Sequence, residues 1–282
     1  MVLFLFILGL FVGSFLGVLV DRIPRKKSFL TGRSYCDNCK KTLAWYDLIP
    51  VVSFFLLKGR CRFCHTKLPF FYPIIEITTG VMFAVTYGLL ISNFSSQGGS
   101  AFGGQFSINN LVSSVYYLFI VSVLIVIFFT DLRYGIIPDK IIFPATFVTF
   151  IWLIINHQTL APRSFSEVGL IINHLLTGVG SFLFLLTVPY LYYLLTKKMG
   201  MGGGDIKFAF LMGLILGFPN IVVALYTAFL TGAFFSIILI LWKKKSLPTG
   251  RIAFGPFLVL GTILSLYWGN QISLYLMRFF GI

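Results

Sequence analysis

Long apolar stretches separated by short polar loops make up most of this chain. A helix that crosses a bilayer needs roughly 20 mostly apolar residues, because the hydrocarbon core is about 30 Å thick and each residue adds about 1.5 Å. Eight stretches qualify, and the fourth and sixth are short. They are residues 1–20, 69–92, 111–130, 141–155, 168–195, 206–218, 221–242 and 253–277. The pattern predicts an all-α polytopic membrane protein with about eight transmembrane helices.

Composition supports this prediction. The 282 residues are 58% hydrophobic and 11% charged, whereas soluble domains carry about 25% charged residues. Residues 1–20 lack a basic start and are followed by basic residues, so we interpret them as a retained helix rather than a cleaved signal peptide. We therefore expect three parts: a first transmembrane helix (1–20), a polar insert (21–68) and a membrane bundle (69–282).

The net charge of +14 follows the loops. Half of the 22 Lys and Arg residues lie in the insert, and all but Arg163 and Arg278 fall on one side of the eight-helix arrangement. The positive-inside rule makes that side the cytoplasm. Orientation and attraction to anionic membrane lipid account for the charge, and it requires no nucleic-acid partner.

All four cysteines lie in the insert, as two Cys-x-x-Cys pairs: Cys36 with Cys39, and Cys61 with Cys64. Paired knuckles of this kind are typical of zinc sites. Two disulfides are the competing interpretation, which a reducing cytoplasm disfavours. Four thiolates leave no coordination position for water, so we expect a structural zinc ion that helps a small insert to fold.

The chain has only eight acidic residues, and Glu76, Asp131 and Asp205 lie in or at the ends of predicted helices. Burying a lone carboxylate is costly, so these residues are functional candidates. The topology places Asp131 and Asp205 at the cytoplasmic ends of their helices. Two carboxylates at one depth do not both ionise easily, which leaves an acid beside a base. One could activate a water while the other protonates the leaving group, as in an aspartic protease.

Three glycines precede Asp205, and glycine lets a substrate backbone approach a carboxylate closely. The candidate substrate-binding residues are Gly202, Gly203, Gly204, Lys207 and Glu76. Purely structural interpretations remain open: Asp205 could cap a helix, and Asp131 could pair with Arg133 or Lys207. Asp139 fits a cap for the next helix and is interpreted as structural or supporting.

These motifs together resemble the bacterial type IV prepilin peptidases, which belong to the GxGD group of aspartic proteases. The motifs are Gly13-Ser14-Phe15-Leu16, Arg22-Ile23-Pro24, the two cysteine knuckles, Trp45 to Pro50, Tyr72 to Glu76, Asp131 with Ile137-Pro138-Asp139, Gly202 to Lys207, and Phe254 to Phe257. The chain departs from the family's pattern at Gly17, where relatives tend to have Asn, and at Asp37, where Pro is common.

The resemblance implies that Asp131 and Asp205 are the catalytic pair. It implies that the substrate is the basic leader of a prepilin or pseudopilin, cut at the cytoplasmic face of the membrane. The product would serve a type IV pilus, secretion or competence system. It also implies that the new N-terminal residue is then methylated from S-adenosylmethionine.

A transporter and a noncatalytic scaffold are the alternatives to a peptidase. A proton- or ion-coupled transporter using Glu76, Asp131 and Asp205 would need acids near the bilayer midplane and repeat symmetry between the halves of the chain. A noncatalytic scaffold whose zinc module recruits a partner would leave the glycine–aspartate motif without a role.

Overall fold

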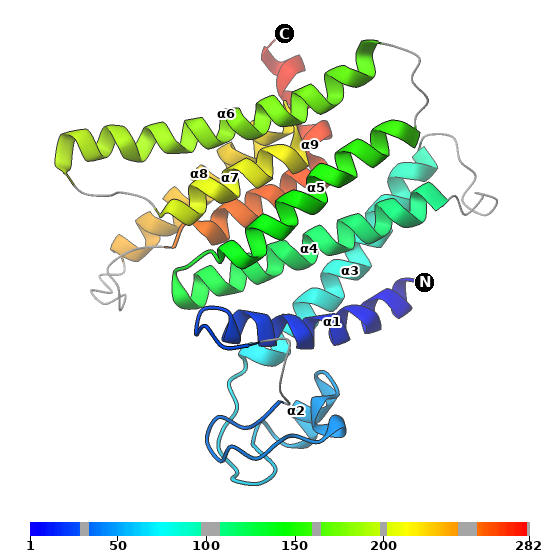
Figure 1. The fold of residues 1–282 in the computed structure, drawn as a ribbon, viewed down its shortest axis with the longest axis vertical. Coiled ribbons are helices and arrows are strands. Elements are labelled where there is room, and N and C mark those ends of the chain that lie inside the picture. Colours follow the sequence, from blue (N-terminus) through cyan, green and yellow to red (C-terminus); the bar gives the residue numbers. More distant parts are fainter. Residues whose placement is uncertain (29–33, 97–107, 160–164, 198–201, 242–252, 281–282) are drawn as a thin grey trace. The chain divides into compact units, whose positions relative to one another are not determined.

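The computed structural model describes residues 1–28, 34–96, 108–159, 165–197, 202–241 and 253–280 (Figure 1). Within these ranges the chain is helical and has no β-strand, only isolated β-bridges. The elements are α1 (Val2–Arg22), the 3₁₀-helix η1 (Trp45–Leu48), α2 (Val52–Leu56), α3 (Phe71–Ser96), α4 (Ile108–Tyr134), α5 (Asp139–Thr159), α6 (Phe165–Thr196), α7 (Gly203–Leu216), α8 (Asn220–Leu241) and α9 (Gly255–Phe280).

Each stretch predicted to cross the membrane coincides with a helix, namely α1 and α3 to α9. In the described part of the chain, six helices are long and apolar enough to cross: α1, α3, α4, α6, α8 and α9. Helix α7 has 14 residues, or about 21 Å at 1.5 Å per residue, and α5 contains Pro144. The all-helical membrane fold is confirmed, whereas crossings by α5 and α7 stay predictions.

The chain divides into two compact units, residues 1–126 and 127–282. The boundary falls inside α4. The predicted division at residues 20 and 68 concerns position relative to the membrane, which is a different property from compactness, so it stays a prediction.

In the first unit, α1 and α3 pack closely because glycines face each other. A Cβ atom added to Gly9 would lie 2.7 Å from the Gly80 Cα, and one added to Gly13 would lie 2.7 Å from the Glu76 Cα. Small residues spaced four apart let membrane helices approach closely and gain van der Waals contact. The insert between α1 and α3 therefore begins and ends on a tightly joined helix pair.

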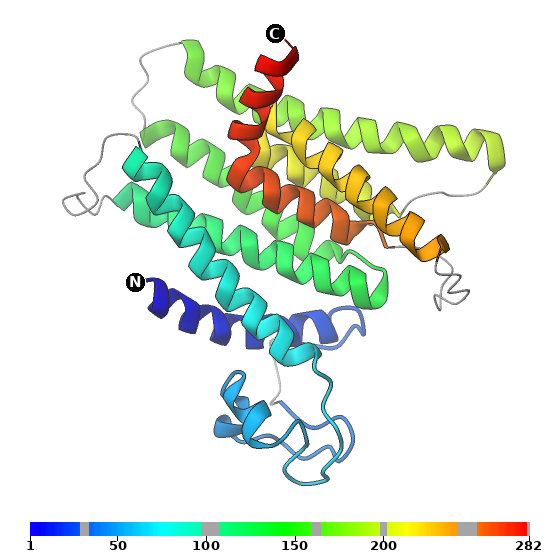
Figure 2. The same cartoon turned by 180° about the vertical axis from the view of Figure 1, so that it is seen from behind.

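In the second unit, the short helix α7 is central and contacts α5, α6, α8 and α9 (Figure 2). Against α6, a Cβ on Gly213 would lie 2.6 Å from the Gly178 Cα, so only glycine permits this approach. The Ser181 hydroxyl of α6 donates a hydrogen bond of 2.8 Å to the Ala209 carbonyl of α7. These contacts hold α7 in a fixed position within its unit.

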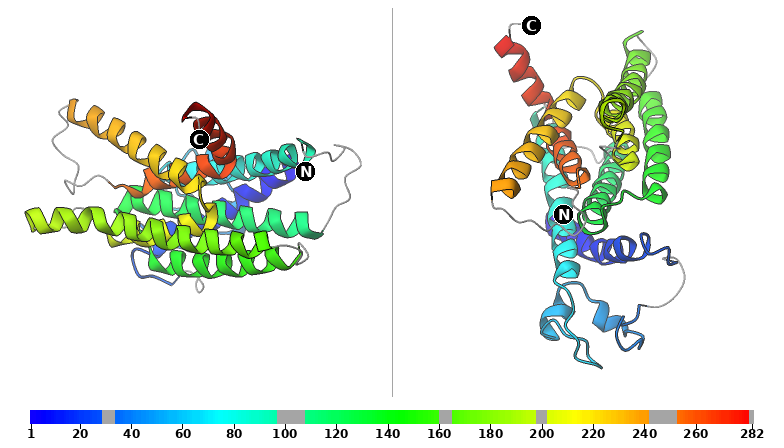
Figure 3. Two further views of the ribbon diagram at one scale, coloured as in Figure 1. Left: turned by 90° about the horizontal axis from the view of Figure 1, so that it is seen from above. Right: turned by 90° about the vertical axis from the view of Figure 1, so that its left-hand side faces the viewer.

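Helices α8 and α9 pack against one another (Figure 3). Gly261 of α9 leaves room for the Ala224 carbonyl of α8. One helical turn away, the Ser265 hydroxyl donates a hydrogen bond of 2.6 Å to the Asn220 carbonyl. Helix α9 begins at Gly255 and also contacts α7, so this pairing helps to position α9 within the unit.

Gly13→Ala is expected to lower the free energy of unfolding by about 1–3 kcal/mol, because the new methyl group would overlap the α3 backbone. Gly88→Ala in α3 is the matched control, since nothing lies within 4 Å of a Cβ there, and it should be neutral or stabilising by up to about 1 kcal/mol. The check is the thermal unfolding midpoint of the purified protein in detergent. Equal midpoints for the two variants would contradict the close α1–α3 contact.

Candidate active site

Asp131 lies in the last turn of α4 and is 5% exposed. The helix ends because Gly135 adopts φ +65° and its N–H donates a hydrogen bond of 2.8 Å to the Asp131 carbonyl. A glycine in this left-handed conformation is a common helix terminator. Pro138 then precedes α5. The sequence between α4 and α5 thus places the Asp131 carboxyl group at the end of a helix.

Asp205 lies in the first turn of α7 and is 8% exposed. The N-cap of α7 is Gly202, so Asp205 is not the cap that the structural interpretation suggested. The Asp205 carboxylate lies near Gly202, where a Cβ would be 3.1 Å from Oδ2. Partial positive charge at a helix N-terminus favours a carboxylate at this position.

The structure brings Asp131 and Asp205 together within the second unit. Their carboxyl groups are close enough for the charge of Asp131 to act on Asp205. The backbone N–H of Gly255, the first residue of α9, interacts with the Asp131 carboxyl group. Asp131 Oδ2 is buried and has no hydrogen-bond partner in the described part of the chain. Three chain segments therefore meet at two carboxyl groups, one of which keeps an unused acceptor.

Ile137 separates the two glycines that border this site. A Cβ on Gly204 would lie 2.9 Å from the Ile137 Cβ, and a Cβ on Gly255 would lie 3.1 Å from the Ile137 Cδ1. A Cβ on Gly255 would also lie 2.5 Å from Asp131 Oδ2. Neither Ile137 nor Gly255 is predicted from the sequence to be a site residue, and their only signal is their place in the motifs Ile137-Pro138-Asp139 and Phe254 to Phe257.

Lys207 points to a partner other than Asp131. Its Nζ lies 2.8 Å and 2.9 Å from Oδ1 and Oδ2 of Asp139, which is the first residue of α5. Both side chains are about half exposed. The pair joins the beginning of α7 to the start of α5, and a supporting role of Asp139 at the site stays a prediction. A contact of Lys207 with substrate stays a prediction.

Glu76 belongs to the first unit, whereas Asp131 and Asp205 belong to the second. It is buried, and its Oε2 accepts a hydrogen bond of 2.7 Å from the Val51 N–H of the insert. Ser14 of α1 also donates a hydrogen bond to it. Glu76 thus joins α3 to α1 and to the insert, and its predicted role in substrate binding stays a prediction.

The four cysteines of the insert form one cluster of free thiols. Their sulfur atoms all lie within 4.8 Å of one another, and Sγ of Cys36 is 3.8 Å from Sγ of Cys64. Tetrahedral zinc with Zn–S bonds of about 2.3 Å needs sulfur atoms about 3.8 Å apart. The donor set could therefore hold a metal ion.

The two knuckles have the same hydrogen-bond pattern. The Cys36 N–H donates to the Lys41 carbonyl at 3.0 Å, and the Cys61 N–H donates to the Thr66 carbonyl at 2.9 Å. Isolated β-bridges flank each knuckle, Tyr35 with Thr42 and Arg60 with Lys67. This local repetition explains how two separate pairs of cysteines come to present their sulfur atoms to one point.

The neighbouring thiols differ in proton affinity. Hydrogen bonds with Thr66 lower the pKa of the Cys64 thiol to about 5. A hydrogen bond from the Lys41 backbone lowers the pKa of the Cys39 thiol. Desolvation and hydrogen bonds with the other three thiols outweigh that effect and raise this pKa to about 11. Four adjacent thiolates repel one another, and a divalent cation removes that repulsion.

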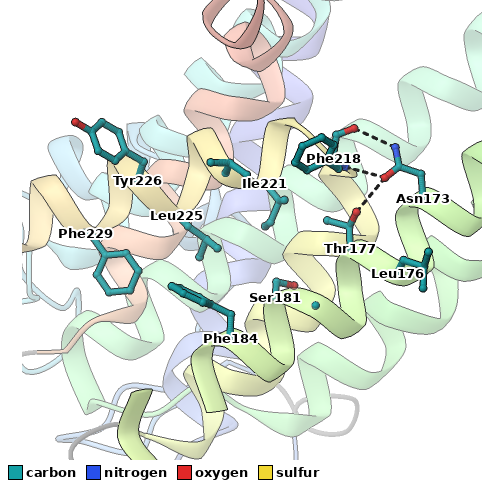
Figure 4. A pocket seen from close by; sticks show the side chains of 12 residues that line it. Asn173, Leu176, Thr177, Ser181, Phe184, Phe218, Ile221, Leu225, Tyr226 and Phe229 are labelled. Carbon is teal, nitrogen blue, oxygen red and sulfur yellow. Dashed lines mark hydrogen bonds between the residues drawn. The ribbon is translucent and has the colours of Figure 1, made fainter. Parts of the chain in front are cut away.

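A cavity of about 670 Å³ lies between α6 and α8 in the second unit (Figure 4). Two of its polar side chains are already bonded: Asn173 donates to the Phe218 carbonyl at 3.0 Å, and Thr177 donates to Asn173 Oδ1 at 3.1 Å. Nearby, Nδ1 of His174 in α6 lies 2.8 Å from the Leu214 carbonyl oxygen of α7, so this ring is used in packing between the two helices. No carboxylate, thiol, imidazole or amine lines the cavity, so it offers no second set of catalytic groups.

Comparisons with known proteins match both halves of the chain. The family model of the bacterial peptidase A24 N-terminal domain matches residues 7–89, which include the cysteine knuckles. The model of the type IV leader peptidase family matches residues 118–237, which include Asp131 and Asp205. No solved structure matches the chain.

Curated relatives match over nearly the whole length. A prepilin leader peptidase/N-methyltransferase of Bacillus subtilis (strain 168) is 31% identical, over 95% of this chain and 94% of the relative. A protein of the same name from Burkholderia pseudomallei (strain 1026b) is 28% identical, over 97% of this chain and 87% of the relative. Another from Aeromonas salmonicida (strain A449) is 25% identical, over 95% of this chain and 91% of the relative. With the carboxyl pair and the cysteine cluster inside the matched regions, the chain belongs to the type IV leader peptidase family.

Proposed function

We propose that this multi-pass membrane protein is an aspartic endopeptidase that removes the basic leader of type IV prepilins or pseudopilins. We further propose that it methylates the new N-terminal residue with S-adenosylmethionine. The observation that carries the peptidase assignment is the meeting of Asp131 and Asp205, two buried carboxyl groups at the ends of α4 and α7. The names of the relatives support both activities.

The proposed chemistry needs one proton shared between the two acids. Two carboxyl groups this close hold one negative charge more readily than two. The ionised carboxylate takes a proton from a water molecule, whose oxygen attacks the carbonyl carbon of the scissile peptide bond. The protonated partner gives its proton to the carbonyl oxygen. Collapse of the tetrahedral intermediate breaks the C–N bond, and the leaving amine takes up a proton.

The glycines before Asp205 suit the binding of an extended peptide. Nothing lies within 4 Å of a Cβ position at Gly203, and Gly202 and Gly203 are exposed. A substrate backbone can therefore run beside the first turn of α7 without meeting a side chain. Lys207, held by Asp139, and Glu76 are proposed as further substrate contacts.

The site is proposed to open to the cytoplasm. Lys and Arg residues concentrate in the loops at the ends of the helices where Asp131 and Asp205 lie. The leader of a prepilin carries basic residues and would remain on that side, while the hydrophobic segment that follows it enters the bilayer. The proposed partners are therefore membrane lipid and prepilin or pseudopilin substrates, and no nucleic acid.

The four cysteines are proposed to bind one structural zinc ion. Cys36, Cys39, Cys61 and Cys64 would complete its tetrahedron, and no catalytic step passes through it. His65 follows Cys64 in a left-handed conformation, with φ of 53°, and is exposed. With four thiols already in place, it is not needed as a ligand.

The transporter interpretation is not supported. The family and its curated relatives are peptidases, and Asp131 and Asp205 lie at helix ends rather than at mid-helix.

Asp131→Asn and Asp205→Asn should each slow leader cleavage by at least about 100-fold, because an amide can neither accept nor donate the required proton. The measurement is the mass of the product formed from a prepilin with a basic leader by enzyme purified in detergent. Asp37→Asn removes an exposed carboxylate of the insert and should cleave at the parent rate. Parent-like cleavage by either site variant would refute the aspartyl assignment.

Methylation should add about 14 Da to the cleaved product, and only when S-adenosylmethionine is present. Asp131→Asn should still methylate a peptide supplied without its leader, because the methyl transfer does not need the carboxyl pair. An unmethylated product from the parent enzyme with S-adenosylmethionine would exclude the second activity and leave the peptidase assignment in place.

Cys61→Ser should remove bound zinc and lower the thermal stability of the insert, because three thiolates bind the ion less tightly than four. Zinc content is measured by elemental analysis, and hydrogen exchange of residues 34–68 reports the stability of the insert. His65→Ala is the neighbouring control and should keep one zinc ion per chain. Metal-free parent protein with unchanged exchange would refute the structural zinc site.

A further inference from the structure

The stretch Trp45–Leu56 in the insert is apolar apart from Asp47 and Ser53. It contains η1 and α2, which are in contact. At about a dozen residues it is too short to cross a bilayer, and apolar stretches of that length are typical of buried helices or of segments at the membrane interface. The exposure of its side chains distinguishes these two cases.

Most of the large side chains of this stretch are exposed. Trp45 is 77% exposed, Phe55 is 63% exposed and Leu56 is 78% exposed. Val52 is also exposed, and only Phe54 of α2 points into the insert. A surface of this kind in water is unfavourable and usually marks a contact with a protein or a membrane.

Asp47, the one charged residue of the stretch, is neutralised. Its side chain is 2% exposed, and its Oδ1 lies 2.7 Å from Nη2 of Arg62. Its Oδ2 accepts a hydrogen bond from the Ala44 N–H. The Arg62 guanidinium also lies over the Tyr46 ring at 4.8 Å. No free negative charge of this stretch therefore opposes an apolar or anionic surface.

Contacts with the start of α3 hold the stretch beside a helix that is long and apolar enough to cross a membrane. The Phe54 ring packs on Phe70, just before α3, with ring centroids 5.2 Å apart. The Val51 N–H donates its hydrogen bond to Glu76, which lies inside the membrane-crossing segment Phe71–Leu89. Helix α2 is thus fixed beside the first turns of a membrane helix.

We propose that Trp45–Leu56 lies in the interfacial layer of the bilayer and binds anionic lipid. Trp45, Phe55 and Leu56 would enter the boundary between headgroups and acyl chains, where amphipathic aromatic rings are favourable. Lys58 and Arg60 follow α2, are exposed and would contact lipid phosphates. The insert would then contact the membrane surface directly, in addition to its two covalent connections to α1 and α3. This inference does not depend on the proposed peptidase activity.

The test uses the full chain in lipid nanodiscs. Replacing Trp152, Trp242 and Trp268 with Phe leaves Trp45 as the single fluorescent indole. Nanodiscs of phosphatidylglycerol and phosphatidylcholine, with bromine atoms near the headgroup end of the acyl chains, should quench Trp45 at least about two-fold. They should also protect Trp45 from acrylamide in the aqueous phase. Unquenched Trp45 that remains open to acrylamide would overturn the proposal.

Two variants make the test specific. Leu56→Glu should reduce the lipid quenching, whereas Phe63→Glu, which changes an exposed apolar residue outside the stretch, should not. Both should keep their zinc content, which shows that the insert is folded. Lys58→Glu, or nanodiscs of phosphatidylcholine alone, should weaken the quenching. Equal quenching in the neutral nanodiscs would overturn the assignment to anionic lipid.

A prepilin or another part of the protein could cover Trp45–Leu56 in place of lipid, and each would give a different result in the fluorescence experiment. A prepilin site would protect Trp45 from acrylamide only when prepilin is added. Coverage by another part of the protein would protect Trp45 in detergent and in nanodiscs alike, without quenching by brominated lipid. Either result would overturn the proposal.

Discussion

Repulsion between two buried carboxyl groups is the interaction that the second unit has to withstand. Asp131 and Asp205 are buried close together, so whenever both are ionised their charges favour separation of the two helix ends. The packing of α7 opposes that separation. Gly213 and Ser181 hold α7 against α6, and the Lys207–Asp139 ion pair holds its first turn to α5. The site is stable because the helix that carries Asp205 is held on several sides.

The glycines of this unit have two different tasks. Gly213 and Gly261 let helix backbones approach each other, which positions α7 and α9. Gly204 and Gly255 instead make room for Ile137 and, at Gly255, for the Asp131 carboxyl group. Enlarging either of the latter would press directly on the groups beside the carboxyl pair, so packing and chemistry depend on the same residues.

In the first unit the insert is small and exposes much apolar surface, so it needs stabilising contacts other than a large hydrophobic core. Four cysteines provide a shared centre, and Glu76 links α1, α3 and the start of α2 through hydrogen bonds. The buried Glu76 carboxylate thus joins several segments of this unit, whereas the buried pair in the other unit is suited to acid–base chemistry. The difference comes from partners: Glu76 accepts two hydrogen bonds, and Asp131 keeps a bare oxygen.

Helix positions, the cysteine cluster and the two acids could all be predicted from the sequence, because apolar length and Cys-x-x-Cys spacing are properties of consecutive residues. The contacts between residues of different helices could not be predicted from the sequence, because they depend on which helix faces pack together. Lys207 was equally compatible with Asp131 until the start of α5 brought Asp139 within 2.8 Å. Ile137 carries no chemical signal of its own, and only packing placed it between Gly204 and Gly255. The sequence by itself determined which carboxylates and thiols are available, and the tertiary structure decided which of them meet.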